Sequence, residues 1–370
     1  MIILLRSDDL NPDPRVEKYV NFYKEKALEY LLIGWNRSED IKPQREDALF
    51  FEKKAGYGKG ARNIVNLILW NWYLLKILLK RREDYQLIHA CDFDTMLPTV
   101  FMKLFWGKKV VFDVFDWYTD SRQIGNKIVK KVLKTVEQWV TKKSDFIIIC
   151  EEERIVQLPK DVDVNKVHVH RNLPDNMIEV DKSANMDEKK RDSYVLSYVG
   201  VFDSGRGLKE LLEAVSHNKQ VVLHMAGFGR LTNIVQNYAA KYDNIKYHGA
   251  VKHDQAMALM GSSDIIVGMY YTINRNHILA APNKYYEALF LGKPLLTNVG
   301  TIVGDRTLKY QTGYAIEEGK EAILKFMADI TEDKNRILGR NAKDLFEKKF
   351  RNSSADFLNN EYLLFVHSLL

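Results

Sequence analysis

Short apolar runs alternate with longer stretches of helical periodicity along most of the chain. In the first half, the apolar runs that predict strands cover residues 2–5, 30–33, 87–90, 110–113 and 146–150. The helical patterns between them cover residues 16–28, 62–82, 96–105 and 127–142. Alternation of this kind is typical of βαβ units, in which a helix connects two parallel strands of one sheet.

A polar segment separates this series from a second one. Residues 179–192 are rich in Asp, Lys, Asn and Ser and carry little periodic apolar content, as expected of a linker. Beyond it, strands are predicted at residues 194–199, 221–225, 245–247, 265–269 and 294–297. Helices are predicted at residues 208–215, 231–242, 255–260, 283–291 and 320–330.

The two series predict an α/β protein with two Rossmann-like, doubly wound domains that face each other across a cleft. The length of 370 residues agrees with two domains, because a single core stops growing at about 250–300 residues. We place the N-terminal domain at residues 1–175, the linker at 176–192 and the C-terminal domain at 193–345. Residues 346–370 are predicted to be helical and to pack back toward the N-terminal domain.

Composition narrows the classes of protein to consider. With 46% apolar and 28% charged residues, the chain can bury real cores and lacks the signature of disorder. The apolar run at residues 2–5 is too short for a signal peptide. Residues 64–79 form the longest apolar segment, but polar residues interrupt it, and it is shorter than the ~20 apolar residues that a membrane-spanning helix needs. Cys91 and Cys150 have no metal-binding spacing. We therefore expect a cytoplasmic protein in a reducing compartment, with no metal.

Positive charge concentrates in one predicted helix. The net charge is +6, and residues 124–140 interleave aliphatic side chains with lysines at helical spacing. These lysines are Lys127, Lys130, Lys131 and Lys134. Two interpretations stay open: a solvated outer face, or a patch that rests on anionic lipid head groups at the inner face of a membrane. No nucleic-acid motif is present and the charge excess is small, so nucleic acid is not expected as a partner.

Two glycine-containing turns of the second half carry candidate binding residues. Arg206 lies in the turn from Gly200 to Gly207, where free N–H groups of the following helix and a guanidinium suit a diphosphate. Gly227 and Gly229 follow the next strand and would let a ring or a phosphate approach the backbone. We assign these glycines to the border of a nucleobase-binding slot, and we place His248 and Val251, farther along the chain, at the same slot. A single histidine is, however, more often structural.

The most specific motif covers residues 281–294. Lys284 and Glu287 lie one turn apart on one helix face, and Asn283 and Tyr286 stand beside them. A solubilising ion pair is the plain alternative. The helix follows a long loop at the carboxyl end of a strand, however, where ligands of α/β folds bind. We therefore assign Asn283, Tyr286 and Glu287 to the binding of a nucleotide-sugar donor, and Lys284 to the catalytic residues.

Taken together, these segments resemble the retaining glycosyltransferases of family 4, which have the GT-B fold. The resemblance covers essentially the whole chain. Its acceptor-side segments are Asp13–Val16, residues 88–94 and residues 110–116, and its donor-side segments are residues 207–214 and 282–294.

The resemblance implies roles for individual residues. Glu287 corresponds to the carboxylate that holds the ribose hydroxyls, and Arg206 to a cation that neutralises the leaving diphosphate. On the acceptor side we select Arg15, Asp92 and Asp94. His89 and Asp116 are placed nearest the acceptor hydroxyl, with a structural role as the alternative for each.

Three positions depart from the family's pattern. Leu279 stands where a second Glu is common, Val201 where a further Arg is usual, and Phe115 where a catalytic His often follows a strand. Lys284 could supply the missing positive charge.

The expected activity is transfer of a sugar, with retention, from a nucleotide sugar to a glycan or polyprenyl-linked acceptor in cell-surface polysaccharide or glycoconjugate synthesis. No cofactor or metal is expected. The alternatives are a GT-B-type sugar-nucleotide epimerase and a catalytically silent partner of another transferase.

Overall fold

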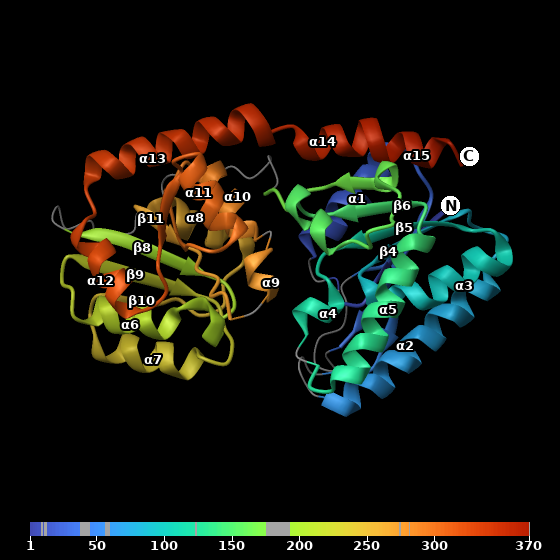
Figure 1. Cartoon of the computed structure of the whole chain (residues 1–370), viewed down its shortest axis with the longest axis horizontal. Helices are drawn as coiled ribbons and strands as arrows, with labels where there is room; N and C mark the ends of the chain where they lie inside the picture. Colours follow the sequence, from blue (N-terminus) through green and yellow to red (C-terminus); the bar gives the residue numbers. More distant parts are fainter. Residues whose placement is uncertain are drawn as a thin grey trace. The chain divides into compact units, whose positions relative to one another are not determined.

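The chain forms two units, each built on its own parallel sheet (Figure 1). The computed structural model describes residues 1–8, 10, 13–37, 45–55, 60–122, 124–174, 193–273, 275–280 and 282–369, without the side chains of 60–63. The first unit contains Met1–Arg171 and Ser354–Leu370, and the second contains Asn172–Ser353. The predicted α/β class with two parallel-sheet domains is confirmed. The predicted linker at 176–192 lies outside the described residues.

The sheet of the first unit has the strand order β3-β2-β1-β4-β5-β6-β7. The strands are β1 (Ile2–Arg6), β2 (Tyr30–Asn36), β3 (Ala48–Glu52), β4 (Leu87–Cys91), β5 (Lys109–Val114), β6 (Phe146–Ile149) and β7 (Val167–Val169). Parallel pairing sets Leu4 of β1 opposite Leu32 of β2 and His89 of β4. The next strands after β1 in sequence, β2 and β3, lie on one side of it and those that follow β4 lie on the other, so the strand order reverses between β1 and β4. Sheets of this kind bind ligands at the carboxyl ends of the strands where the order reverses.

Helices cover both faces of this sheet (Figure 1). On one face lie α1 (Pro14–Glu25), α14 (Ser353–Phe357), a π-helical turn (Leu358–Tyr362) and α15 (Leu363–His367), and their side chains share a core cluster with β1, β4 and β6. On the other face lie α2 (Gly60–Lys80), α3 (Met96–Trp106) and α5 (Lys127–Lys143). Shorter elements are α4 (Tyr118–Ser121) and the 3-10 turns Phe93–Thr95, Glu152–Gln157 and Val164–Lys166. None of the helices within the described ranges is both long and apolar enough to cross a bilayer.

The sheet of the second unit has the order β10-β9-β8-β11-β12-β13. Its strands are β8 (Tyr194–Val199), β9 (Val221–Ala226), β10 (Ile245–Tyr247), β11 (Ile265–Val267), β12 (Leu295–Asn298) and β13 (Gly313–Ile316). The order reverses between β8 and β11, so the carboxyl ends of these two strands border the crevice where this kind of sheet binds ligands.

Eight helices of the second unit are described. They are α6 (Leu208–Ser216), α7 (Thr232–Lys241), α8 (His253–Ser262), α9 (Arg275–Ile278), α10 (Asn283–Leu291), α11 (Ile302–Lys309), α12 (Lys320–Ala328) and α13 (Glu332–Leu345), with a π-helical turn at Phe346–Phe350. In Figure 1, α6, α7 and α12 lie on one side of the sheet, and α8, α10, α11 and α13 lie on the other. Helix α10 ends at Gly292, which adopts the left-handed conformation (φ 64°) that stops a helix.

Candidate functional site

Lys284 lies at the carboxyl ends of β8 and β11. The helix α10 carries it so that its methylenes pass over Gly268, and its Nζ lies 2.7 Å from where a Cβ on Gly200 would be. The same Nζ is 4.7 Å from the centre of the Tyr198 ring. A side chain at position 200 would therefore displace the ammonium group, so Gly200 is required for this placement.

Arg206 approaches from the 3-10 turn Ser204–Arg206 between β8 and α6. Its guanidinium stacks 4.3 Å from the centre of the buried Tyr270 ring. Its Nη1 is buried, and no group in the described part of the chain accepts a hydrogen bond from it. A buried donor without an acceptor costs stability, and this one indicates a place for an anionic ligand.

Glu287 is one helical turn beyond Lys284 on α10, and its side chain is buried. Burial raises the pKa of the Glu287 carboxyl, while the nearby ammonium of Lys284 opposes that rise. Across the described residues, no hydrogen bond to the carboxylate is present in the ligand-free protein. Both oxygens are therefore open to hydroxyl donors of a ligand.

The electrostatics of this corner favour an anion. Burial, together with the neighbouring charge of Arg206, lowers the pKa of Lys284 to about 8, against the opposing pull of Glu287. Two cations thus lie near one carboxylate, and the net charge is positive. We call Arg206, Lys284 and Glu287 the donor cluster.

We expect binding of a nucleoside diphosphate to weaken above about pH 8, because the free site then loses the Lys284 proton that the bound diphosphate would retain. Affinity should fall about ten-fold per pH unit until the pKa of the complex is reached. Calorimetry between pH 7 and 9.5, in buffers of different ionisation heat, would detect the proton uptake. The Lys284→Ala variant serves as the control, and an equally steep profile in it would contradict this origin.

Gly227 and Gly229 bring two backbone segments together. A Cβ on Gly227 would lie 1.9 Å from the carbonyl oxygen of Gly200, and one on Gly229 would lie 2.4 Å from that of Phe202. The close approach that we predicted for a ligand is thus made by the protein's own backbone. These glycines position the loop after β8, and their role as donor contacts stays a prediction.

Asn298 at the end of β12 was not predicted from the sequence. Its side chain accepts a hydrogen bond from the Tyr270 N–H (2.6 Å) and donates one to the Tyr270 carbonyl (3.0 Å). This clamp fixes the loop after β11 and thereby the ring on which Arg206 stacks. An Asn at the end of a buried strand was its sole signal in the sequence.

His248 and Val251 line a cavity of about 450 Å³ at the end of β10 and the start of α8. The Nε2 of His248 lies 2.8 Å from Nδ1 of His224. Burial lowers the pKa of both rings, that of His224 to about 4, so both are neutral near pH 7. A cavity of this volume is in the range of small-ligand sites.

The side chains of the remaining two donor assignments differ in exposure. Asn283 is exposed at the first position of α10. Tyr286 is fully buried, its hydroxyl accepts a hydrogen bond from Arg306, and its ring packs on Phe350. The contacts of the Tyr286 side chain lie within its own unit, and its assignment to the donor stays a prediction. Two residues correspond to about 200° around a helix, so a side chain two positions from Lys284 faces the core instead.

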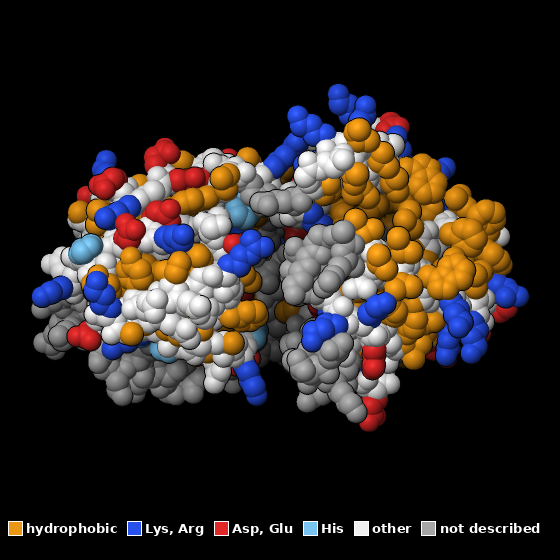
Figure 2. Space-filling view, turned by 90° about the horizontal axis from the view of Figure 1, so that it is seen from below, with side chains coloured by type: hydrophobic (Ala, Val, Ile, Leu, Met, Phe, Trp, Pro, Cys, Tyr) orange, Lys and Arg blue, Asp and Glu red, His pale blue; other side chains and the backbone are white. Residues whose placement is uncertain are grey.

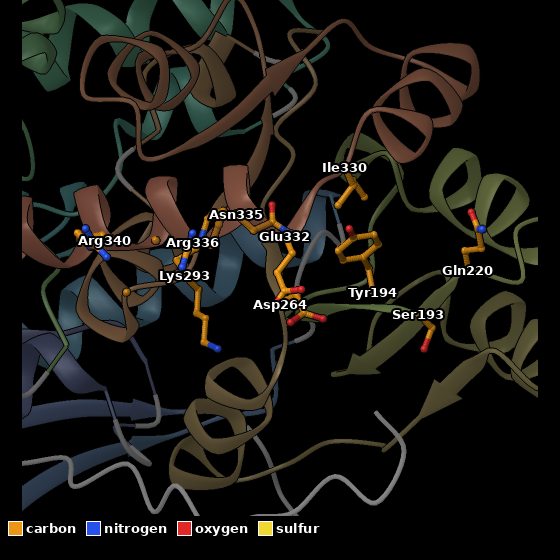
Figure 3. A pocket seen from close by; sticks show the side chains of 13 residues that line it. Ser193, Tyr194, Gln220, Asp264, Lys293, Ile330, Glu332, Asn335, Arg336 and Arg340 are labelled. Atoms are coloured by element: carbon orange, nitrogen blue, oxygen red, sulfur yellow. The ribbon is translucent and has the colours of Figure 1, made fainter. Parts of the chain in front are cut away.

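A second cavity, of about 780 Å³, lies at the amino ends of the strands of this sheet (Figure 3). Tyr194, Asp264 and Pro294, which line it, stand at the amino ends of β8, β11 and β12, and Lys293 and Arg336 border it. None of the predicted site residues belongs to its lining. The donor cluster occupies the opposite ends of the same strands.

In the first unit, Arg15 and His89 belong to a buried polar network around Asp113. Arg15 donates two hydrogen bonds to the Asp113 carboxylate (2.6 and 3.0 Å) and one to the carbonyl of His170 (2.6 Å). His89 is fully buried, with its Nδ1 at 2.9 Å from the Tyr362 hydroxyl. Neither side chain faces solvent, and the contacts of both in the described structure are internal to the fold. Their assignment to the acceptor side stays a prediction.

Asp92, Asp94 and Asp116 follow β4 and β5. Asp92 accepts hydrogen bonds from the backbone N–H groups of Phe115 and Asp116, at 2.9 and 3.3 Å, and pairs with Arg6. Burial raises the pKa of Asp92 to about 6. Asp94 is buried, but the side chain of Asp116 is 56% exposed. Of the three, Asp116 is the one that an acceptor can reach.

Phe115, which replaces the histidine that the resemblance implies, supports cations instead. The guanidinium of Arg6 lies 4.1 Å and that of Arg15 4.9 Å from its ring centre. This ring has no group that could exchange a proton. The side chain of Phe115 therefore cannot act as a general acid or base.

One group of potential metal ligands occurs among the described residues. Atoms of His89, Cys91 and Asp113 lie within 4.8 Å of one another, and all three residues are buried. The Asp113 carboxylate is already paired with Arg15, so a metal ion would have to displace a guanidinium. Asp92 and Asp94 likewise pair with arginines.

The family model described as glycosyl transferases group 1 matches residues 180–345. No curated protein is a significant match in sequence. Among solved structures, sucrose-phosphate synthase from Thermosynechococcus elongatus is similar, with a TM-score of 0.74, 15% identity and 99% of each chain covered.

Two further structures illustrate the same likeness. HepE from Anabaena in complex with UDP-glucose has a TM-score of 0.71 at 12% identity, over 97% of this chain and 98% of the other. WaaG, described as a glycosyltransferase involved in lipopolysaccharide biosynthesis, has a TM-score of 0.65 at 13% identity, over 97% and 100%. At such identities, these structures establish the shared two-domain fold.

Proposed function

We propose that this chain, a glycosyltransferase of the GT-B fold with a group 1 domain at residues 180–345, transfers a sugar from a nucleotide-sugar donor, with retention, to a glycan or polyprenyl-linked acceptor. One observation carries the proposal. In the donor cluster, a buried N–H of Arg206 has no hydrogen-bond partner among the described residues, and the Lys284 ammonium and the buried Glu287 carboxylate complete the cluster.

The chemistry assigns these side chains different tasks. As the bond between the anomeric carbon and the phosphate oxygen breaks, negative charge grows on the leaving nucleoside diphosphate. Arg206 and Lys284 stabilise this charge more strongly than the ground state, which accelerates the reaction. Glu287 holds the ribose hydroxyls and so fixes the position of the donor.

With retention, the acceptor attacks on the face that the diphosphate leaves, and a phosphate oxygen takes the proton of the acceptor hydroxyl. The two side-chain cations do the work of a divalent ion, so no metal enters the scheme. The exposed carboxylate of Asp116 is the first unit's candidate for orienting the acceptor hydroxyl. Both cysteines are free and buried, as suits a protein working in the cytoplasm.

The basic face of α5 supports a membrane-borne acceptor. Lys127, Lys130, Lys131 and Lys134 are exposed on this helix, and each lysine near an anionic surface contributes about 1 kcal/mol. A lipid-linked acceptor would be met at such a surface.

Replacing Glu287 by Gln is expected to weaken nucleotide binding by about 1–3 kcal/mol, because an amide keeps the shape but loses the charge-assisted hydrogen bonds to the ribose. Isothermal titration calorimetry with the nucleoside diphosphate measures the change. Glu213→Gln on the exposed side of α6 is the matched control. Unchanged affinity in a folded Glu287→Gln protein would remove this residue from the site.

A screen of nucleotide sugars by thermal shift identifies the donor, because a ligand at 100 times its dissociation constant adds about 2.7 kcal/mol of stability. Product analysis with the donor found, with and without acceptor lipids or glycans, then tests the reaction. A glycosylated acceptor with the donor's anomeric configuration is the expected product. An isomerised or hydrolysed sugar without acceptor identifies an epimerase, and binding without turnover a silent partner.

A further inference from the structure

Three neighbouring helices of the first unit expose large hydrophobic side chains to solvent. Helix α2 packs beside α3, and α3 packs beside α5. Most of the exposed large hydrophobic side chains of the described residues lie on these helices: Ile64, Val65, Ile68, Leu69, Trp72, Leu97, Leu104, Phe105, Trp106, Ile128, Val129, Val132 and Trp139. Figure 2 shows hydrophobic side chains gathered over the first unit, on the right of the view. We call this set the three-helix surface.

Helix α2 is apolar on both of its faces. Trp70 and Leu74 are fully buried against the sheet, whereas Ile68 and Trp72 on the opposite side are mostly exposed. A surface helix ordinarily presents polar side chains to water, and a helix that is apolar all round is normally buried. The outer face of α2 therefore indicates a second apolar environment outside the protein.

Unpaired lysines accompany the three-helix surface. The only acid in the three helices is Glu137, which is buried and accepts hydrogen bonds from Tyr118 and Thr119. Within the described residues, these lysines of the three helices make no ion pair: Lys76, Lys80, Lys127, Lys130, Lys131, Lys134 and Lys143. The surface thus combines apolar area with uncompensated positive charge.

Each of the three helices contributes one exposed tryptophan. Trp72, Trp106 and Trp139 are 67%, 39% and 42% exposed. An indole has an apolar body and a polar N–H, and it is enriched where hydrocarbon meets water. Three such rings on three adjacent helices suit one planar interface.

We propose that the three-helix surface inserts into the head-group region and outer acyl region of a bilayer that contains anionic lipid. The apolar side chains replace water with hydrocarbon, and the lysines meet lipid phosphates. A second copy of the chain does not fit as the occupant, because two such faces would bring lysines together without any exposed acid from these helices. The inference deepens the proposed function, on which its biological purpose rests, by naming the partner of the first unit.

Insertion makes a prediction that purely electrostatic attachment does not. The purified whole chain is floated with phosphatidylcholine vesicles that contain or lack phosphatidylglycerol, at low salt and at about 1 M salt, where the Debye length is only about 3 Å. We expect binding to the anionic vesicles, with a part that persists at high salt. Loss of all binding at high salt would overturn insertion.

Three variants separate the contributions. The apolar variant carries Ile68→Ser, Trp72→Ser and Phe105→Ser and is expected to lose about ten-fold in partitioning for each replaced side chain. The charge variant carries Lys130→Glu, Lys131→Glu and Lys134→Glu and should lose the salt-sensitive part. The control variant, Leu308→Ser with Ile337→Ser, changes equally exposed aliphatic residues of the second unit and should bind as the wild type does.

Fluorescence gives a readout independent of flotation. Brominated phospholipid should quench the wild-type emission, and the variant with Trp72→Phe, Trp106→Phe and Trp139→Phe should lose this quenching while it still binds. Wild-type protein that floats with none of the vesicles overturns the proposal. So does a wild-type dimer in ultracentrifugation that the apolar variant converts to a monomer, because the surface is then an interface between copies.

Nucleotide binding is measured on the same preparations, so the two proposals can fail separately. Protein that binds a nucleotide sugar but no vesicle refutes the membrane surface alone. Protein that floats with vesicles but transfers no sugar refutes the proposed reaction alone.

Discussion

Replacing Lys284 or Arg206 by Ala is expected to lower kcat about 10²–10³-fold, a loss of about 2.7–4 kcal/mol, while donor affinity falls much less. The reason lies in where the two cations are fixed. Lys284 is held over Gly200 and Arg206 on the ring of Tyr270, so neither has to reorganise as charge grows on the diphosphate. Single-turnover and steady-state kinetics with the identified donor separate the two effects.

The Lys284→Ala substitution should not destabilise the fold. Burial lowers the pKa of Lys284, which means that its charge is held at a cost in stability. Lys284→Ala should thus melt no lower than the wild type, and Lys325→Ala, an exposed change on α12, should leave both stability and kinetics unchanged. If Lys284→Ala and Arg206→Ala turn over at the wild-type rate, backbone N–H groups alone hold the leaving group.

Asp113→Asn is expected to destabilise the first unit by about 3–5 kcal/mol, the usual loss when one partner of a buried ion pair is removed. Asp113 is fully buried, receives two hydrogen bonds from Arg15 and accepts a third from the Tyr19 hydroxyl at 2.9 Å. An amide keeps the shape but leaves the guanidinium of Arg15 without a counter-charge. Urea unfolding followed by circular dichroism measures the loss.

Asp84→Asn is the matched control, because this carboxylate belongs to the same unit, is 53% exposed and, among the described residues, pairs only with the exposed Arg81. Its effect should stay within about 0.5 kcal/mol. A loss of similar size in both variants would mean that the Asp113 pair contributes nothing specific to stability.

The pH dependence of the same pair has a definite sign. Burial by itself would raise the pKa of Asp113, but the charge of Arg15 and the His89 ring hold it well below its usual range. A carboxyl whose folded-state pKa is depressed stabilises the protein above its unfolded pKa of about 3.9 and loses that contribution as the pH falls. The difference in stability between wild type and Asp113→Asn should therefore shrink below about pH 4.

Local periodicity predicted the inner strands of both sheets, but it missed β3 and β7 at the two edges of the first sheet. Neither of these edge strands contains a fully buried side chain, so neither has the run of core-facing residues that marks an inner strand. Helix α13 was missed for another reason. Its fourteen residues are mostly charged or polar, and its few buried positions, such as Leu338 and Ala342, do not form a visible apolar stripe.

The donor cluster was accessible from the sequence to the extent that its geometry is local. Lys284 and Glu287 share a helix face because they are three residues apart, and that relation needs no tertiary information. The partner of Arg15 is 98 residues away, so nothing in the sequence distinguishes a buried structural arginine from one that meets an acceptor. The clamp of Asn298 on Tyr270 spans 28 residues and was invisible for the same reason.

The core of the first unit is complete only when the C-terminal segment Ser354–Leu370 packs onto it. The Tyr362 hydroxyl meets Tyr23 and His89, at sequence separations of 339 and 273 residues, and Ser354 meets His170. On the ribosome, the first 171 residues emerge long before these partners, and the whole second unit is made in between. Until the chain is complete, the nascent N-terminal part lacks these hydrogen-bond partners for its buried polar side chains. We therefore expect the second unit to finish folding before the first, although domains usually fold in the order of synthesis.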